Sequence, residues 1–453
     1  MRSTNKTLNR RQFFRTTAGL LAAPAIIPAT ALGRDGNAPN NRIQVGVIGL
    51  GARGFNLLGS FLAERDAVVV AVCDVDKLHY RDNRWGEGTA YGRKGAAERV
   101  RDFYTRREDP GAAAALDVYS DYRELCRRDD IDAVVIATPD HWHALCTLEA
   151  LKHGKDIYCE KPVTHFFREG QAVYREVAKQ QAVFQAGSQQ RSDGRFQRVV
   201  ELAMNGLLGK IQRIEVGLNE GYAKPMGDPT VTDPPGHLDY DFWCGPAPVL
   251  PYMRARHHRW WRGHRAYGGG VLMDWIGHHN DIAHWALGLD HSGPVKVEAA
   301  EWTFPETEVY NTPQDYTIRC EYEAGISSTI SSRNRGGVKL IGEDGWVYAR
   351  RGALEASEET WTQRSFNPGP KKACDSSHHV RNFLECIRTR KPCVAPAETA
   401  HRSITPGHLG YVSNSLGRPI AWDPAAEKPV DDPEAEQLLN AVDYRAPWAF
   451  GAA

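Results

Sequence analysis

Short apolar runs alternate with helix-like segments along the first 190 residues of the chain. The apolar runs occupy 43–48, 67–73, 131–139, 155–162 and 182–190. Helix-like patterns lie between them, as in FNLLGSFLAE at 55–64 and HALCTLEALKHG at 143–154. Strands that alternate with helices favour a doubly wound parallel sheet, so we predict an α/β protein. Residues 78–118 lack clear apolar periodicity and predict an inserted loop and a polar helix over the sheet edge.

A glycine-rich turn follows the first apolar run directly and leads into the first helix-like segment. It reads Gly49-Leu50-Gly51-Ala52-Arg53-Gly54. In this pattern one glycine makes the tight turn, one lets the backbone approach a pyrophosphate, and one lets helix pack on strand. The second run ends in Asp74, near the spacing at which an acid binds the adenosine ribose. The alternative is a plain glycine turn with a solvated Asp74, but the combination predicts a dinucleotide-binding Rossmann domain over residues 42–190.

The carboxylate at Asp74 also bears on which dinucleotide is bound. It would repel the 2′-phosphate of NADP, and Asp76 adds negative charge, which Lys77 partly offsets. NAD is therefore the predicted cofactor, with NADP the less favoured one.

The N-terminus carries the pattern of an export signal. NRRQFFR at 9–15 contains Arg10 and Arg11, and an apolar stretch from Ala18 to Leu32 follows, ending near the small residues of Ala29-Thr30-Ala31. This predicts a twin-arginine signal peptide over residues 1–31 and a periplasmic or otherwise exported protein. The alternative is a basic, partly helical N-terminus of a cytosolic protein. The stretch is shorter than the roughly 20 residues that span a bilayer, so we expect no membrane association after signal removal.

Composition and net charge limit the classes of binding partner that the sequence predicts. The 453 residues are 42% hydrophobic and 25% charged, which is typical of a globular protein of two or three domains. Basic and acidic residues number 56 each, but the proposed signal holds five basic residues and no acid, so the remaining chain is mildly acidic. This balance disfavours a nucleic-acid partner. The nine cysteines show neither C-x-x-C nor Cys/His ligand spacing, so we predict packing residues, with no metal site and no disulfide framework.

Several motifs in fixed order resemble a known family. They are VGVIGLGARG, CDVD, ATPDHWHA, CEKPVTH, AGSQQRS, FWCGPAP and GGGVLMDWIGHHNDIAHWALG. Over about residues 42–430 the chain resembles the Gfo/Idh/MocA oxidoreductases, the glucose-fructose oxidoreductase and inositol dehydrogenase family. The resemblance implies a substrate-binding and oligomerisation α+β domain with a large open antiparallel sheet at 191–430. A C-terminal tail at 431–453 follows, and we expect a homo-oligomer formed through that sheet.

The resemblance also implies three catalytic residues. Lys161 in Glu160-Lys161-Pro162 matches a lysine beside the nicotinamide and the substrate hydroxyl. Its place at the end of a predicted parallel strand agrees, because doubly wound folds bind ligands there; without this context a surface lysine would be the plainer interpretation. Asp274 and His278 match a pair on one helix, and their i,i+4 spacing puts both on one face. His278 would accept the hydroxyl proton, and Asp274 would orient it or contact the substrate.

Further residues are placed around the cofactor and the substrate. The family positions matched near the ribose and nicotinamide are Thr138, Pro139, His141, His143, Glu160 and Gln189. Residues predicted at the substrate are Arg191, Trp261, Tyr267, His279 and Asp281. Aromatic side chains interleaved with polar ones suit a sugar, namely Trp243, Trp260, Trp261 and Tyr267 with Arg254, His257 and His258. Tryptophans packed on a sheet edge are the structural alternative.

Three functions remain open from the sequence. The leading one is an exported NAD(P)-dependent oxidoreductase that transfers hydride between a nicotinamide cofactor and a hydroxyl of a sugar, polyol or glycoside. The alternative is an NAD-dependent glycosidase of the α-N-acetylgalactosaminidase type, which oxidises its sugar transiently and eliminates the aglycone. Such glycosidases depart from the E-K-P pattern at the lysine, so Lys161 favours the oxidoreductase. The third is a cofactor-loaded sensor without turnover.

Overall fold

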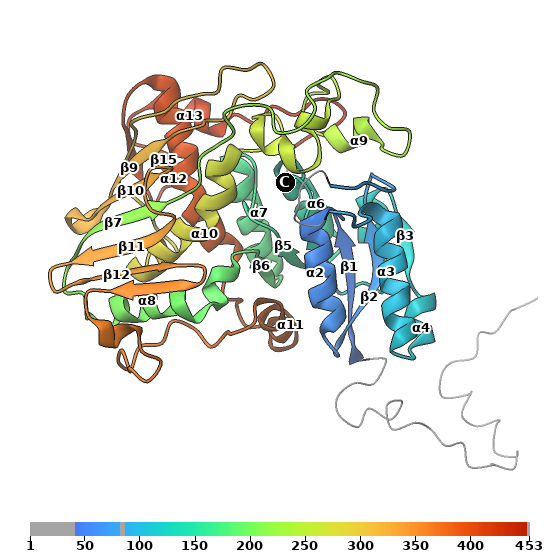
Figure 1. Ribbon diagram of the computed structural model, residues 1–453, viewed down its shortest axis with the longest axis horizontal. Coiled ribbons are helices and arrows are strands. Elements are labelled where there is room, and N and C mark those ends of the chain that lie inside the picture. Colours follow the sequence, from blue (N-terminus) through green and yellow to red (C-terminus); the bar gives the residue numbers. More distant parts are fainter. Residues whose placement is uncertain (1–40, 82–86, 451–453) are drawn as a thin grey trace, which may run out of the picture. The chain divides into compact units, whose positions relative to one another are not determined.

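The computed structural model describes residues 41–81 and 87–450. The predicted signal peptide therefore lies outside the described residues. Two sheets dominate the described part, and both belong to one contiguous unit that begins at Ile43 (Figure 1).

The first sheet has six strands in the order β3-β2-β1-β4-β5-β6, and every neighbouring pair is parallel. This confirms the predicted Rossmann-type sheet. Strand β2 is buried along its whole length, as expected for an apolar strand covered on both faces by helices. The strands are β1 (Ile43–Ile48), β2 (Ala67–Cys73), β3 (Asp117–Tyr119), β4 (Ala133–Ile136), β5 (Asp156–Cys159) and β6 (Phe184–Ala186).

The helices of this domain follow the strands, as the alternating pattern predicted. They are α2 (Ala52–Ala63), α3 (Gly92–Arg106), α4 (Pro110–Ala114), α5 (Tyr122–Cys126), α6 (Asp140–Lys152) and α7 (Phe167–Gln180). The segment predicted as a loop and a polar helix contains α3, α4 and the start of edge strand β3. The buried side of α3 consists largely of glycine and alanine, including Gly95, Ala96 and Ala97, so its periodicity is not visible in a hydrophobicity pattern.

The second sheet has nine strands in the order β13-β12-β11-β7-β10-β9-β8-β14-β15. Its neighbouring strands are antiparallel except β7 and β10, so the predicted open antiparallel sheet is a mixed, mostly antiparallel one. Its strands are β7 (Ile211–Gly217), β8 (Lys296–Ala299), β9 (Thr317–Glu321), β10 (Ser327–Ser331), β11 (Gly337–Gly342), β12 (Trp346–Arg350), β13 (Ala353–Ala356), β14 (Ile420–Asp423) and β15 (Lys428–Pro429).

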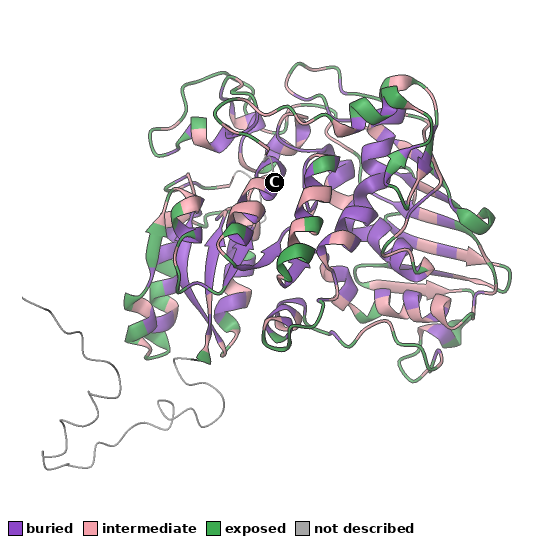
Figure 2. Ribbon diagram, turned by 180° about the vertical axis from the view of Figure 1, so that it is seen from behind, coloured by how far each residue is buried: buried purple, intermediate pink, exposed green. Residues whose placement is uncertain are grey.

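Helices cover the inner face of this sheet. Two long ones, α10 (Gly270–Leu287) and α12 (Ala397–Leu416), pack on each other and on the sheet, and α8 (Gly194–Met204) packs on β12. Figure 2 shows the buried strands and helix faces of this layer. Arg213, Arg319 and Glu321 are exposed along the strands. Oligomerisation through the sheet stays a prediction.

The C-terminal region returns to the Rossmann domain. Its helices are α11 (His379–Thr389) and α13 (Pro433–Asn440), and α13 packs on α7. Arg381 of α11 forms an ion pair of 2.6 Å with Asp66. Beyond α13, Trp448 stacks on Phe242 with ring centroids 5.5 Å apart. The described part of the segment predicted as a tail is therefore packed on the fold.

Two general predictions can be compared with the described residues. All nine cysteines are free thiols there, and eight of them are buried, which confirms that most serve as packing residues. Among the helices described, none combines the length and the apolar character needed to cross a bilayer.

Candidate functional site

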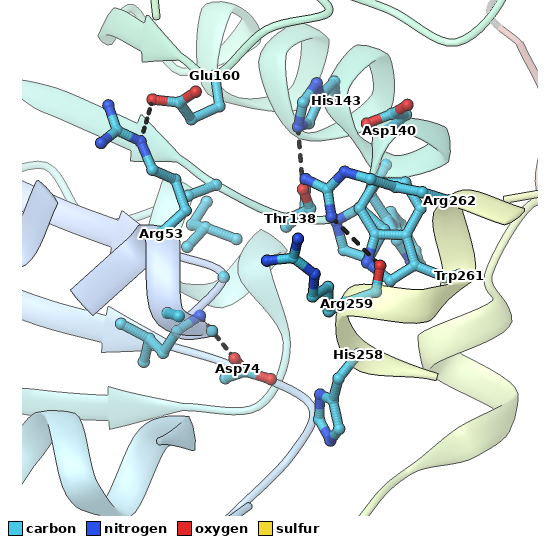
Figure 3. Close-up of a pocket in the computed structure, with 18 of the residues that line it drawn as sticks. Arg53, Asp74, Thr138, Asp140, His143, Glu160, His258, Arg259, Trp261 and Arg262 are labelled. Atoms are coloured by element: carbon cyan, nitrogen blue, oxygen red, sulfur yellow. Dashed lines mark hydrogen bonds and ion pairs between the residues drawn. The ribbon is translucent and has the colours of Figure 1, made fainter. Parts of the chain in front are cut away.

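A cavity of about 470 Å³ opens at the carboxyl ends of the parallel strands β1, β2, β4 and β5. Doubly wound sheets bind their ligands at this edge. The opposite wall comes from the second domain and includes η4 (His258–Gly263) and α10. Figure 3 shows Trp261 and Arg262 facing the Rossmann side from η4. Both domains thus contribute side chains to one site.

The glycine-rich turn shapes the floor of the cavity. Gly49 has φ +85°, a left-handed conformation that favours glycine. A Cβ on Gly54 would lie 1.9 Å from the Gly49 carbonyl oxygen, so Gly54 permits the helix to pack on the strand. A Cβ on Gly51 would meet nothing within 4 Å. Because Gly51 precedes α2 and lines the cavity, this empty space lies at a helix N-terminus and fits a pyrophosphate.

Asp74 lies at the edge of this floor, as the sequence predicted. Its carboxylate accepts hydrogen bonds from the backbone N–H groups of Leu50, at 2.6 Å, and Asp76, at 2.9 Å. Burial raises the pKa of Asp74. Each carboxylate oxygen has a second lone pair, so Asp74 can still accept hydrogen bonds from ribose hydroxyls. The residues present therefore fit a dinucleotide.

Asp76 gathers three histidines beside the cavity. Its Oδ1 lies 2.9 Å from Nδ1 of His237, and its Oδ2 lies 3.3 Å from both Nδ1 of His79 and Nε2 of His258. The Oδ2 atom and the His79 and His258 nitrogens lie within 4.8 Å of one another, a spacing that could hold a metal. The rings of His79 and His258, however, stack with their centroids 3.6 Å apart and an angle of 20° between their planes. Ring lone pairs lie in the ring planes and do not converge here, so we interpret the group as a cluster of close polar contacts around Asp76, in which His237 makes the hydrogen bond.

Glu160 anchors the middle of the cavity. It accepts hydrogen bonds from Arg53 Nε at 2.7 Å and from Gln189 Nε2 at 3.0 Å (Figure 3). Burial raises the pKa of Glu160, but Arg53 and Lys161 outweigh it, and the net shift is downward. Glu160 is therefore a carboxylate that fixes Arg53 and Gln189 against the floor.

The residues that follow β4, in the turn and at the start of α6, contribute unequally to the cavity. Thr138, Pro139 and His143 line the cavity. The ring nitrogens of His143 lie 2.7 Å from the Pro162 carbonyl oxygen and 3.0 Å from that of Thr138, so this ring positions the backbone. His141 does not line the cavity; its nitrogens lie against two backbone carbonyls of the second domain, and burial lowers its pKa to about 4.

The predicted lysine and aspartate meet across the two domains. Lys161 Nζ donates to Asp274 Oδ1 at 2.6 Å and to the Asp274 carbonyl oxygen at 2.7 Å. Arg262 Nε lies 3.0 Å from the same Oδ1. Burial raises the pKa of Asp274, but Arg262 and Lys161 hold it well below its usual range. Asp274 thus orients Lys161, whereas the sequence had placed it as the residue that orients His278 or contacts the substrate.

His278 lines the same cavity, one turn along α10 from Asp274. Its Nε2 lies 3.1 Å from Nη2 of Arg351, and its buried Nδ1 has no hydrogen-bond partner among the described residues. Burial, Lys161 and Arg351 lower its pKa well below the usual value. The imidazole is therefore neutral near pH 7, the protonation state that a proton acceptor needs.

Four of the predicted substrate residues lie elsewhere. Arg191 forms a buried ion pair with Asp281, with Nε 2.7 Å from Oδ2, and does not line the cavity. His279 Nδ1 lies 2.7 Å from the Gly217 carbonyl oxygen. The Tyr267 hydroxyl donates to the Pro248 carbonyl oxygen at 3.2 Å. These four side chains stabilise the second domain, because each satisfies a buried polar group. Trp261 lines the cavity, as do Trp243 and His258 of the aromatic and basic set.

Sequence reasoning missed several ionisable residues of the cavity, three of which bear directly on the site. Asp140 follows Pro139 in the ATPDHWHA motif, and burial raises its pKa to about 7. Arg262 lies in the aromatic and basic stretch that was singled out for its tryptophans. Arg351 belongs to the turn between β12 and β13, 73 residues from His278, and no local pattern marks it.

Parts of this chain are similar in sequence to curated proteins with several different descriptions. A glycosyl hydrolase family 109 protein of Saccharopolyspora erythraea is 31% identical over 175 residues, 35% of this chain and 34% of that protein. The chain spans about a quarter to a half of the length of the curated relatives it matches.

Solved structures share the fold. An aldose-aldose oxidoreductase from Caulobacter crescentus, complexed with glycerol, is 17% identical with a TM-score of 0.58, covering 84% of this chain and 99% of that chain. GenD2 from gentamicin A biosynthesis, in complex with NAD, is 19% identical with a TM-score of 0.57, covering 84% of this chain and 97% of that chain.

Family models cover both domains. A model of the oxidoreductase family's NAD-binding Rossmann fold matches residues 43–188. A model of the C-terminal alpha/beta domain of the same family matches residues 194–450. The chain therefore belongs to the Gfo/Idh/MocA family of oxidoreductases, with an NAD-binding Rossmann domain followed by the family's C-terminal domain.

Proposed function

We propose that this protein is an NAD-dependent oxidoreductase that transfers hydride between a nicotinamide cofactor and a hydroxyl-bearing carbon of a sugar, polyol or glycoside. The observation that carries the proposal is the meeting of Lys161, Asp274 and His278 in one cavity with the glycine-rich turn. When bound, NAD supplies C4 of its nicotinamide as the hydride acceptor.

Lys161 is the group best placed to hold the alcohol oxygen. An ammonium has three N–H donors, and Asp274 accepts two of them through its carboxylate and its carbonyl oxygen. One donor remains for the substrate. Because Asp274 fixes Nζ from the second domain, the remaining N–H has a defined direction, which is what orientation of a substrate requires.

His278 would accept the hydroxyl proton as hydride leaves the carbon. Its neutral state near pH 7 provides the lone pair, and it lies one turn along α10 from Asp274, the residue that holds the Lys161 ammonium from across the cavity. Two groups would therefore act on one alcohol, Lys161 as hydrogen-bond donor and His278 as base.

The choice of NAD over NADP rests on Asp74. Its carboxylate lies at the edge of the floor, held by two backbone N–H groups, where it would repel a 2′-phosphate. The cofactor released on denaturation of the purified protein, identified by mass spectrometry, tests the choice directly.

Hydride transfer is tested by following absorbance in the NADH band while a panel of sugars, polyols and aryl glycosides is supplied. His278→Ala should lower kcat by about 10²–10⁴-fold, the usual worth of general acid–base catalysis, with cofactor binding intact. His279→Gln is the matched control, because the amide can still donate to the Gly217 carbonyl and the residue does not line the cavity. Full activity of His278→Ala would reject the catalytic assignment.

A second candidate function is an NAD-dependent glycosidase. The local identity to a glycosyl hydrolase family 109 protein, and to an alpha-N-acetylgalactosaminidase of Shewanella oneidensis that is 26% identical over 172 residues, favours it. The same assay separates the two. Reduced cofactor that accumulates supports the dehydrogenase, whereas reduced cofactor that appears only transiently while aglycone accumulates supports the glycosidase.

Export through the twin-arginine route belongs to the proposal as well. Replacement of Arg10 and Arg11 by Lys should retain the protein in the cytoplasm, folded and loaded with cofactor. Unchanged periplasmic accumulation of the doubly substituted protein would reject this route.

A further inference from the structure

Two arginines that line the cavity, Arg259 and Arg351, have no carboxylate partner among the described residues, and Arg351 is the one that contacts His278. Three other cationic side chains there have carboxylate partners, and the pairs are Arg53 with Glu160 at 2.7 Å, Lys161 with Asp274 at 2.6 Å, and Arg262 with Asp274 at 3.0 Å. Arg351 has none among the described residues. Its guanidinium lies 5.3 Å above the Trp275 ring and 3.1 Å from the His278 imidazole. A positive charge without a counter-charge therefore faces the cavity.

The contact between Arg351 and His278 fixes the state of the imidazole. Guanidinium has only donors, so its Nη2–H donates to Nε2 of His278, which must present a lone pair. The imidazole proton then resides on Nδ1, which is buried without a hydrogen-bond partner among the described residues. Both nitrogens are thus unable to take a substrate proton while Arg351 stays in place.

A carboxylate would change this arrangement. Arg–carboxylate bonds are charge-assisted and often bidentate, so a carboxylate competes for the guanidinium far better than a neutral imidazole or hydroxyl does. A guanidinium engaged by a carboxylate would leave Nε2 open to the substrate hydroxyl. A carboxylate also cancels one of the positive charges that lower the pKa of His278, which makes the imidazole a stronger base.

We propose that Arg351 forms a subsite for a carboxylate of the substrate, and that a carbohydrate acid bound there releases Nε2 of His278 to act as the base. The substrate class is then a uronate or aldonate and not a neutral sugar. The inference rests on the proposed redox function and names the substrate class for it.

The exposed position of Arg351 suits such a role. The residue lies in the turn that follows β12, is exposed to solvent, and lines the cavity. Its neighbour Arg350 is exposed on the same hairpin but does not line the cavity. The chain thus offers a matched pair of arginines for an experiment.

The test measures binding to the NAD-loaded protein by isothermal titration calorimetry. The probes are glucuronate, galacturonate, mannuronate and gluconate, each beside its neutral counterpart: glucose, galactose, mannose and sorbitol. At least one acid should bind about 10-fold or more tightly than its counterpart, as expected for hydrogen bonds to a charged group. Arg351→Gln should abolish that preference, Arg351→Lys should keep part of it, and Arg350→Gln should keep all of it.

Two outcomes would overturn the proposal. The first is a panel in which no acid binds more tightly than its neutral counterpart, absent binding included, and the second is a preference that survives in Arg351→Gln. The result is separable from the redox proposal. Acid binding through Arg351 without reduced cofactor would reject hydride transfer and keep the subsite, whereas cofactor reduction by neutral sugars in the unsubstituted protein, with no preference for the acids, would do the reverse.

Discussion

Replacement of Lys161 by Met tests the bond between the two domains and the chemistry at once. Methionine keeps most of the aliphatic stem and removes the ammonium, so both hydrogen bonds to Asp274 are lost. The side chains of Lys161 and Asp274 are only 13% and 19% exposed, so solvent screens the pair little. Asp274 keeps Arg262 at 3.0 Å and is not left without a partner.

The magnitude follows from that remaining partner. Loss of one member of a fully buried pair costs about 3–5 kcal/mol, but a retained second cation reduces the loss toward that of hydrogen bonds to a charged group, about 1.5–3 kcal/mol. We expect Lys161→Met to lower the free energy of unfolding by about 2 kcal/mol. The rate of hydride transfer should fall by about 10²–10⁴-fold, because the donor to the alcohol oxygen is gone.

Urea denaturation and single-turnover kinetics measure the two effects separately. Lys155→Met is the control, since Lys155 is a buried lysine whose ammonium donates to the Arg128 and Ile131 carbonyl oxygens, at 2.6 and 2.8 Å, outside the cavity. It should lose stability and keep its rate. A Lys161→Met protein with an unfolding free energy within about 0.5 kcal/mol of the original, or with an undiminished rate, would refute the reasoning.

The other predictions concern the floor and the rim of the cavity. Gly51→Ala should weaken NAD binding and leave the melting temperature unchanged, because its Cβ meets no other atom of the protein within 4 Å. Gly54→Ala should lower the melting temperature, because its Cβ would lie 1.9 Å from the Gly49 carbonyl oxygen. Equal melting temperatures of the two variants by calorimetry would contradict this. Asp74→Ala should weaken NAD binding and improve NADP binding in fluorescence titrations, and unchanged affinities would remove Asp74 from the ribose site. Burial raises the pKa of Asp140 to about 7, so the folded state holds a proton that the unfolded chain releases near pH 4, and stability falls as pH rises from about 4 to about 7. Asp140→Asn should abolish that fall in urea denaturation, and an unchanged slope would contradict the shift.

The sequence predicted the parts of the site that depend on short stretches of chain. Gly49 and Gly51 lie in the turn between strand β1 and helix α2, and Asp74 follows the next strand, β2. These elements are consecutive in the chain, so the spacing of the three residues is enough to predict that they lie at one edge of the sheet. Lys161 was predicted by its position at the end of a strand and by family resemblance. Hydrophobic periodicity also predicted the parallel sheet and most of the helices around it. It did not mark α3, because the buried side of that helix is largely glycine and alanine.

The sequence could not show which polar residues pair with one another. Arg191 and Asp281 carry the residue types of a substrate site, yet they bind each other in the interior of the second domain. Arg351 reaches His278 only because the β12–β13 turn folds back over α10, a contact across 73 residues. Pairing of charges is a property of tertiary packing, so a residue's chemistry alone does not tell whether it faces a ligand or a counter-charge.

The position of His278 depends on hydrogen bonds from the Rossmann domain to the backbone of α10. Lys161 donates to the Asp274 carbonyl oxygen at 2.7 Å, and Ser188 Oγ donates to the Gly277 carbonyl oxygen at 2.9 Å. Both donors come from the ends of parallel strands that border the cofactor cavity, and both acceptors lie on the turn of α10 that precedes His278. These two bonds fix the rotation of α10 about its axis and its distance from the glycine-rich turn. Side chains of the cofactor domain thus hold the backbone of α10 just before His278, so the proposed proton acceptor is positioned relative to the cofactor cavity, whereas Arg351 approaches it from an exposed turn.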